Sequence, residues 1–213
     1  MPKQTTQILV APRTFFGALM TNVLSTTTAL LLGSTMLVSS VHAGDDGMAE
    51  LKKVMQSQIE LMKPELQTKV KGLSTDTKMT LMAILAMHSR VSDNATMRQV
   101  MLEVMQDFQT ISVGIMTNSP EMTADAARRL ANHRIPVGGL LPYLGMENIS
   151  DERLAVLGTF NDSVEGNATK LAEAADTGDM ASAAALLGSI STGCVGCHAV
   201  FRPEKIGKSD LLR

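Results

Sequence analysis

The sequence predicts an all-α fold in which helices pack as a bundle. Aromatic residues make up 3% of the 213 residues and Trp is absent, whereas strands favour aromatic and β-branched side chains. The apolar residues recur at steps of three and four, which is the period of a helix that is buried on one side. A chain of this length fits one domain with an appendage.

The first 43 residues are expected to be a secretory signal peptide. They carry Lys3 and Arg13 but no acidic residue, then an apolar run over 29–38, then Val41 and Ala43 at the two small positions of a cleavage site. The apolar run is shorter than the ~20 residues of a membrane-spanning helix, so no span is expected after cleavage. Loss of the two basic residues leaves a mildly acidic exported protein, which has no electrostatic reason to bind nucleic acid.

Residues 44–93 are expected to form a helical, Met-rich extension. Met48, Met55 and Met62 recur at seven-residue spacing, and Pro64 ends or kinks their helix. A second short helix fits the residues from Thr75 to Arg90. The Met stripe is typical of core packing, although soft thioethers also bind Cu(I).

Four longer helices are predicted in the rest of the chain. The first spans 96–118, with Asp93 or Asn94 as its N-terminal cap and Pro120 beyond its end. A shorter helix fits 121–132. The stripe of the first helix consists of Met97, Val100, Met101, Val104, Met105, Phe108, Ile111 and Ile115.

The third helix is predicted over 151–176, and the last helix follows Asp179 as its cap. The last helix has an apolar seam at Met180, Ala183, Leu187, Ile190, Cys194, Cys197 and Phe201. Steps that alternate between three and four suit nearly antiparallel helix packing. Residues 94–213 are therefore predicted to form an antiparallel four-helix bundle, preceded by the extension over 44–93.

The run Cys-Val-Gly-Cys-His over 194–198 is the part of the sequence that indicates a cofactor. Two thiols one helical turn apart match the two vinyl groups of haem, and His198 can reach the iron as proximal ligand. A thioredoxin-like pair would need a βαβ setting, and a zinc site would have only His88 and His133 as further ligands. A structural disulfide would leave His198 unexplained. The pattern therefore predicts one covalent haem c on the last helix, held by Cys194 and Cys197.

The chain resembles the cytochrome c′ and cytochrome c-556 group of periplasmic bacterial haem proteins. The resemblance covers about 94–203 and rests on the haem motif followed by Phe201-Arg202, on the turn over 174–179, on Phe160 and on the run over 98–114. It implies a left-handed four-helix bundle whose last helix holds the haem. It does not explain the extension.

The sixth iron position separates two functions within this group. Alignment on the group's first helix, with Phe108 kept on the core face, puts Met101 at that position. A Met ligand suits electron transfer, whereas an apolar side chain leaves a five-coordinate iron that binds NO or CO. A shift of one residue would bring in Leu102 instead, and Met is also a common gap-filler in cores.

Other side chains also have expected roles beside the haem. Phe201 is expected to pack on the haem, Arg202 to lie near its proximal side or a propionate, and Arg98 to neutralise a propionate. Either arginine could equally be a solvated surface charge. His88 and His133 are expected to be surface or helix-end residues rather than iron ligands.

The sequence thus favours a periplasmic mono-haem c-type cytochrome that carries single electrons and is not an enzyme. The alternative is a five-coordinate protein that binds NO or CO for sequestration or sensing. A weak peroxidase lacks support because no distal His-Arg pair stands out. Periplasmic redox proteins are the expected partners, and the resemblance leaves a homodimer open.

Overall fold

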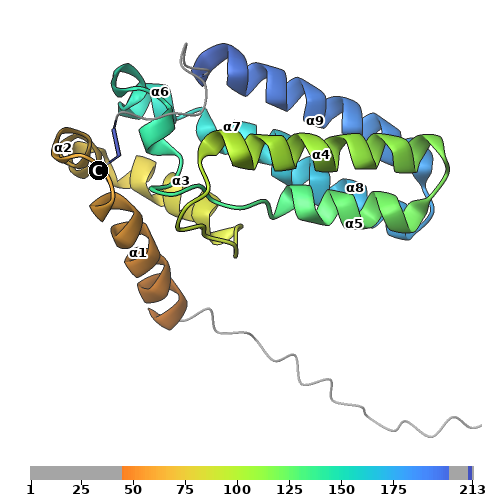
Figure 1. Ribbon diagram of the computed structural model, residues 1–213, viewed down its shortest axis with the longest axis horizontal. Coiled ribbons are helices and arrows are strands. Elements are labelled where there is room, and N and C mark those ends of the chain that lie inside the picture. The colour runs from red at the N-terminus through yellow and green to blue at the C-terminus, as the bar shows by residue number, and fades with distance from the viewer. Residues whose placement is uncertain (1–44, 202–210, 213) are drawn as a thin grey trace, which may run out of the picture. The chain divides into compact units, whose positions relative to one another are not determined.

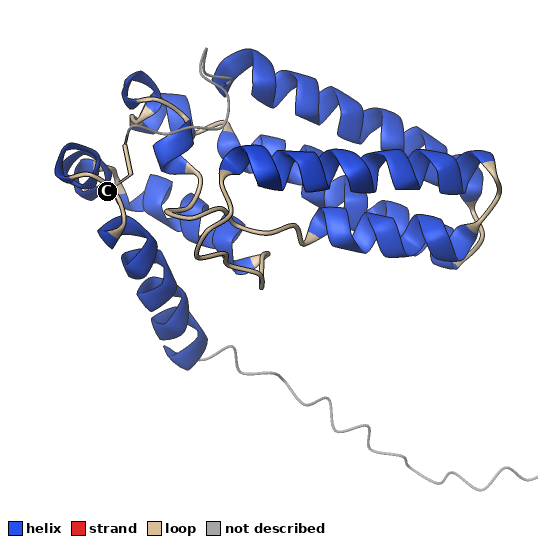
Figure 2. Cartoon of the chain, in the orientation of Figure 1, coloured by secondary structure: helices blue, strands red, loops and turns tan. Residues whose placement is uncertain are grey.

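The computed structural model describes residues 45–201 and 211–212, which form helices joined by turns (Figures 1 and 2). The helices are α1 (Asp45–Glu60), α2 (Pro64–Gly72), α3 (Thr75–Ala86), α4 (Met97–Met116), α5 (Pro120–Ala131), α6 (Asp151–Leu154), α7 (Leu157–Asn161), α8 (Asn167–Asp176) and α9 (Met180–Phe201). Two isolated bridges, and no strand, occur within these residues. The all-α prediction is confirmed. The expected signal peptide over 1–43 lies outside the described residues.

The longer helices pack as a bundle around one apolar cluster, here called cluster 1. α4 packs against α5, α5 against α8, α8 against α9, and α9 against α4 (Figure 1). The buried members of cluster 1 are Ala95, Val100, Val104, Ile111, Ala126, Ala127, Leu130, Val164, Ala168, Leu171, Ala172, Ala183 and Ile190. Most of each predicted stripe faces this interior, as the sequence periods predict. Met105 of the α4 stripe is an exception at 51% exposed, and Cys197 and Phe201 at the end of the α9 seam pack elsewhere.

The start of α4 differs from the prediction. Thr96 is the cap: its hydroxyl accepts from the Gln99 N–H, and the Gln99 side chain accepts from the Thr96 N–H. Asp93 and Asn94 are not the cap, because only Thr96 has a Gln three residues later to complete this reciprocal pair. The far end matches the prediction, since Asn118 has a left-handed φ of 52° before α5 begins.

The helix predicted over 151–176 is interrupted. It consists of α6, a short turn, α7, one π-helical turn over Asp162–Gly166, and α8. Side chains compete here for backbone carbonyls: Ser163 Oγ donates to Thr159 O (2.7 Å) and Asn167 Nδ2 donates to Ser163 O (3.0 Å). Such bonds offer the backbone alternatives to the regular α-helical ladder. The wide turn lies beside α9 and contacts it.

The extension packs on a second apolar cluster, here called cluster 2. Its buried members are Met62, Leu66, Val70, Leu73, Leu141, Leu144, Ile149, Leu154, Leu157 and Phe201. Pro64 is the first residue of α2, as its fixed φ favours. Of the predicted Met stripe, Met62 is buried but Met48 is 46% exposed, so only the end of the stripe is core. All described residues belong to one compact unit.

α9 is apolar along its length but only partly covered. Among the described residues it is the helix that is long and apolar enough to cross a membrane by length and composition, and 17% of its most apolar stretch is buried. The same composition suits a bundle helix, and α9 packs against α4, α7 and α8. Its exposed positions include the small residues Ala181, Ala184, Ala185 and Gly188, and also Val195.

Candidate functional site

The last two turns of α9 carry the Cys-x-x-Cys-His motif. α9 starts cleanly because Gly178, with a φ of 76°, ends the preceding helix. Asp179 then accepts from the Ser182 N–H (3.0 Å) and caps α9, as predicted. An unbroken helix follows, so Cys194 and Cys197 lie one turn apart on one face.

Both thiols are half-buried and neither forms a disulfide. Cys194 packs against cluster 1 and Cys197 packs against cluster 2. Burial raises the pKa of the Cys194 thiol, and raises that of Cys197 to about 11; the Glu165 carboxylate adds to both effects. Redox-active Cys-x-x-Cys pairs have lowered thiol pKa values instead, so these thiols do not fit a thioredoxin-like pair.

The residues after the thiols point in different directions. The His198 side chain is exposed and is therefore accessible to a group outside the apolar clusters. Phe201 is 4% exposed and meets Phe160 edge-on, with ring centroids 6.2 Å apart. Arg202 lies outside the described residues, so its expected role near a propionate stays a prediction.

α4 brings the expected sixth ligand to the same interior. Met101 is half-buried and packs against cluster 1, which also takes Cys194. Leu102, the residue that a one-residue shift would bring in, is 61% exposed, and Met105 is 51% exposed. Arg98 is also exposed. Met101 and Cys194 therefore pack against the same apolar cluster, whereas Leu102 faces solvent.

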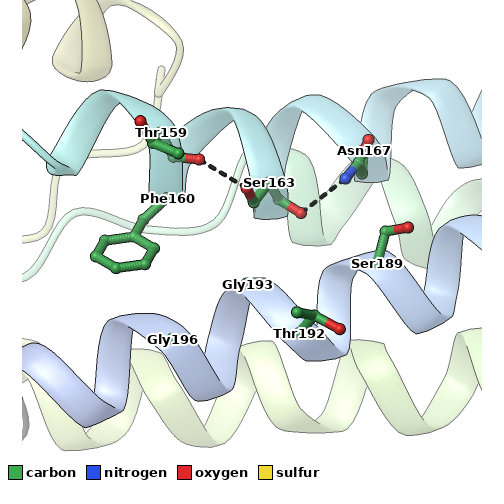
Figure 3. Close-up of a pocket in the computed structure, with 8 residues that line it drawn as sticks. All are labelled: Thr159, Phe160, Ser163, Asn167, Ser189, Thr192, Gly193 and Gly196. Carbon is green, nitrogen blue, oxygen red and sulfur yellow. Dashed lines mark hydrogen bonds between the residues drawn. The ribbon is translucent and has the colours of Figure 1, made fainter.

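A cleft of about 410 Å³ lies between α9 and the segment from α7 to α8 (Figure 3). It is lined by Thr159, Phe160, Ser163, Asn167, Ser189, Thr192, Gly193 and Gly196. A Cβ on Gly193 would lie 2.9 Å from Ser163 Cβ, and one on Gly196 would lie 3.0 Å from Phe160 Cε1. α9 can therefore approach this segment closely only because both positions are glycine.

The donor set of this site fits a covalently bound haem. Two protonated thiols one turn apart can add to two vinyl groups, and an accessible imidazole beside the second thiol can serve as an axial ligand. The cleft reaches the motif at Gly196, but its lining includes neither the two thiols nor His198. Each thiol packs on one side against an apolar cluster, as a group with an apolar face requires.

A cluster of His88, His133 and Glu165 was not anticipated from the sequence. One ligand atom from each residue lies within 4.8 Å of the others. His88 is 7% exposed, and the side chains of His133 and Glu165 are 15% and 12% exposed. The expected helix-end position is confirmed, since His88 follows the end of α3 and His133 follows the end of α5, but both side chains turn inward and are not surface residues. Three separate segments supply the cluster, so no short motif signals it.

No family model matches this chain, and no curated protein or solved structure is significantly similar to it.

Proposed function

We propose that this chain is a periplasmic mono-haem c-type cytochrome that carries single electrons. Cys194 and Cys197 would form the two thioether bonds, and His198 would be the proximal ligand. The observation that carries the proposal is the Cys-x-x-Cys-His run on an apolar helix whose two thiols are half-buried against the apolar clusters. The protein would act as a carrier rather than as an enzyme, since no substrate bond is made or broken.

The arrangement of the helices supports the same proposal. α4, α5, the α7–α8 segment and α9 correspond to the antiparallel four-helix bundle that the cytochrome c′ and cytochrome c-556 resemblance implies, with α1–α3 as the extension. α9 has more apolar surface than its neighbours cover, which suits a helix that also holds a large apolar group. Bound haem would supply the Fe(III)/Fe(II) couple, whose potential is tuned by axial ligation and burial.

Side chains of this protein would surround the proposed haem iron. Phe160 and Phe201 meet beside Cys197 in cluster 2 and would exclude water from this side. Met101 would be the distal ligand, since it packs where Cys194 packs. A thioether ligand favours ferrous iron and raises the potential, which suits an electron carrier.

Attachment is tested with the full-length chain expressed in a bacterium that matures c-type cytochromes. Haem stain should stay with the wild-type polypeptide through denaturing electrophoresis and should be lost in Cys194→Ala/Cys197→Ala. Val195→Ala is the matched control, because Val195 lies between the two thiols but is 67% exposed. Stain retained by the double variant would contradict the proposal.

Distal ligation is tested by the absorption spectra of Met101→Ala. The wild-type ferric protein should be low-spin with the long-wavelength band of Met–iron ligation, and the variant should become high-spin and bind CO when reduced. Met97→Ala, one turn earlier on the same stripe and also half-buried, should keep the wild-type spectrum. A wild-type protein that is already high-spin and binds CO would instead identify the gas-binding alternative.

The proposed location and partners have their own tests. Osmotic shock should release a protein that starts at Gly44, as mass spectrometry of its N-terminus would reveal; recovery only in the membrane fraction would contradict this.

A homodimer is proposed on the outer face of α4, whose apolar residues Leu102, Met105, Val113 and Met116 are between 51% and 84% exposed. Leu102→Glu should then halve the mass measured by light scattering, whereas a monomeric wild type would exclude the dimer.

A further inference from the structure

The buried cluster of His88, His133 and Glu165 has the composition of a transition-metal site. His88 follows α3, His133 follows α5, and Glu165 belongs to the π-helical turn. Two imidazoles and one carboxylate are a common ligand set for zinc and related divalent ions. π turns are frequent at functional sites, and this one brings a carboxylate to two histidines.

The Nδ1 atom of each imidazole is hydrogen-bonded to a backbone carbonyl oxygen. His88 Nδ1 lies 2.8 Å from Ile84 O, and His133 Nδ1 lies 2.8 Å from Arg134 O. A carbonyl oxygen only accepts, so each Nδ1 carries the proton. Each Nε2 of the neutral ring therefore keeps its lone pair. Metal-binding histidines are oriented in this way by a partner on the other nitrogen.

The two Nε2 atoms are poorly satisfied by protein atoms alone. His133 Nε2 lies 3.1 Å from Glu165 Oε1, so the ring must carry a second proton or share a cation with the carboxylate. His88 Nε2 is buried without a hydrogen-bond partner. Protonation of His88 would place two positive rings side by side, since their centroids are 4.6 Å apart. One metal ion would accept lone pairs from both rings and from the carboxylate.

The distances are compatible with such an ion. Zinc–ligand bonds of 2.0–2.1 Å place tetrahedral ligand atoms about 3.3 Å apart. His133 Nε2 and Glu165 Oε1, at 3.1 Å, are close to this separation, whereas the whole set spans up to 4.8 Å, so the side chains would have to draw together to share one ion. We infer that His88, His133 and Glu165 bind one divalent transition-metal ion of the zinc class, with its fourth position open to water.

This site uses none of the residues assigned to haem. It is independent of the proposed electron transfer, and either assignment can fail without the other. Glu165 nevertheless lies close enough to the motif to raise the pKa of both thiols. The test must therefore separate the cluster from the cysteines and from His198.

Zinc binding is measured by isothermal titration of the full chain after dialysis against a chelator. The expected result is one Zn²⁺ per chain. Each of three substitutions should weaken Zn²⁺ binding by roughly tenfold or more, because each removes one ligand atom from the ion. They are His88→Asn, His133→Asn and Glu165→Gln. The Asn variants retain an amide N–H toward the backbone carbonyl but lose Nε2. Glu173→Gln on α8, which is exposed, is the matched control and should bind as wild type.

Several results would overturn the site. They are the absence of saturable Zn²⁺ binding, wild-type affinity in His88→Asn and Glu165→Gln, or loss of binding only in Cys194→Ser/Cys197→Ser. A low-spin haem that becomes high-spin in His88→Asn or His133→Asn, without zinc binding, would make the imidazoles iron ligands instead. Circular dichroism should verify that each variant is folded. Zn²⁺ should raise the Tm of the wild type but not that of Glu165→Gln.

Discussion

The Asp151 carboxylate joins the start of α6 to the start of α3. Its Oδ1 accepts from Thr77 Oγ1 (2.6 Å) and from the Ser74 N–H (2.9 Å). These hydrogen bonds, first that of the Thr77 hydroxyl, hold the pKa of Asp151 below its ordinary value of 3.8. Charge-assisted bonds of this kind stabilise the folded state only while the carboxyl is ionised.

Asp151→Asn should therefore destabilise the protein in a pH-dependent way. Because the folded pKa is lowered, the stabilisation is present above the unfolded pKa and is lost as pH falls through the folded pKa. The difference in free energy of unfolding between wild type and variant should be largest at pH 5 and above and should shrink below about pH 4. Urea unfolding followed by circular dichroism across this range measures it.

The matched control is Asp93→Asn. Asp93 is exposed, and Thr96 caps α4 in its place, so Asp93→Asn should leave the free energy of unfolding unchanged. A large effect of Asp93→Asn would contradict the assignment of the cap. The correct cap was visible in the sequence as Thr96 with Gln99 three residues later. Asp and Asn are preferred cap residues as single positions, but the reciprocal bond between Thr96 and Gln99 decides the cap here.

At the scale of the element, α9 has two glycines with opposite roles. At Gly188 a Cβ would meet nothing within 4 Å, whereas at Gly193 it would lie 2.9 Å from both Ser163 Cβ and Val164 Cγ2. Ser163 Cβ is bonded directly to the backbone of the π turn, whose Ser163 carbonyl carbon lies 3.2 Å away, so these atoms cannot rotate out of the way. The close packing of α9 on this turn depends on Gly193.

Gly188→Ala should stabilise the protein by about 0.5–1 kcal/mol, because Ala is the better helix former. Gly193→Ala should destabilise it by about 1–3 kcal/mol through overpacking, in spite of the same gain in propensity. Chemical denaturation of the two variants measures the contrast. Equal effects of the two substitutions would mean that α9 does not pack on the π turn.

The π turn also marks where helix prediction failed. The apolar stripe here advances by two successive steps of four residues, from Phe160 to Val164 to Ala168. Such steps suit a wider turn, but they also fit a regular helix whose stripe shifts slightly around its axis. The sequence therefore predicted the buried face of the segment, and Val164, Ala168 and Leu171 are buried. It could not predict the interruption, because that depends on side chains competing for carbonyls in the folded backbone.

At the scale of the whole molecule, the extension and the bundle share cluster 2. Leu66 of α2 is fully buried there, together with Leu154, Leu157 and Phe201 from the bundle side. The α2 part of the extension is therefore built into this core. Neither periodicity nor the family resemblance predicted this contact, because it joins residues that are far apart in sequence.

Leu66→Ala should lower the free energy of unfolding by about 2–5 kcal/mol, as other buried Leu deletions do. Hydrogen exchange should show faster opening of both α2 and the Phe201 end of α9. Leu61→Ala, whose Leu is 41% exposed, should change stability by about 0.5 kcal/mol or less. Faster exchange confined to α1–α3 would mean that the extension unfolds by itself.

The candidate site was predictable to the extent that its signals are local. The Cys-x-x-Cys-His motif and its place on an apolar seam follow from adjacent residues, and so does Met101 on the stripe of α4. His88, His133 and Glu165 do not, because helix ends 45 residues apart and a π turn bring them together. Their burial depends on tertiary packing, which a single sequence does not reveal.

The contact of the two thiols with different clusters would have a consequence for the order of events in the proposed haem attachment. In the folded chain Cys194 and Cys197 are half-buried and pack against two separate parts of the core. A maturation enzyme that joined haem to them would need both sulfurs accessible. Attachment and folding would then compete, because a chain that folds first covers part of each thiol. Under the proposed function, thioether formation should therefore precede the packing of α9 onto its neighbours.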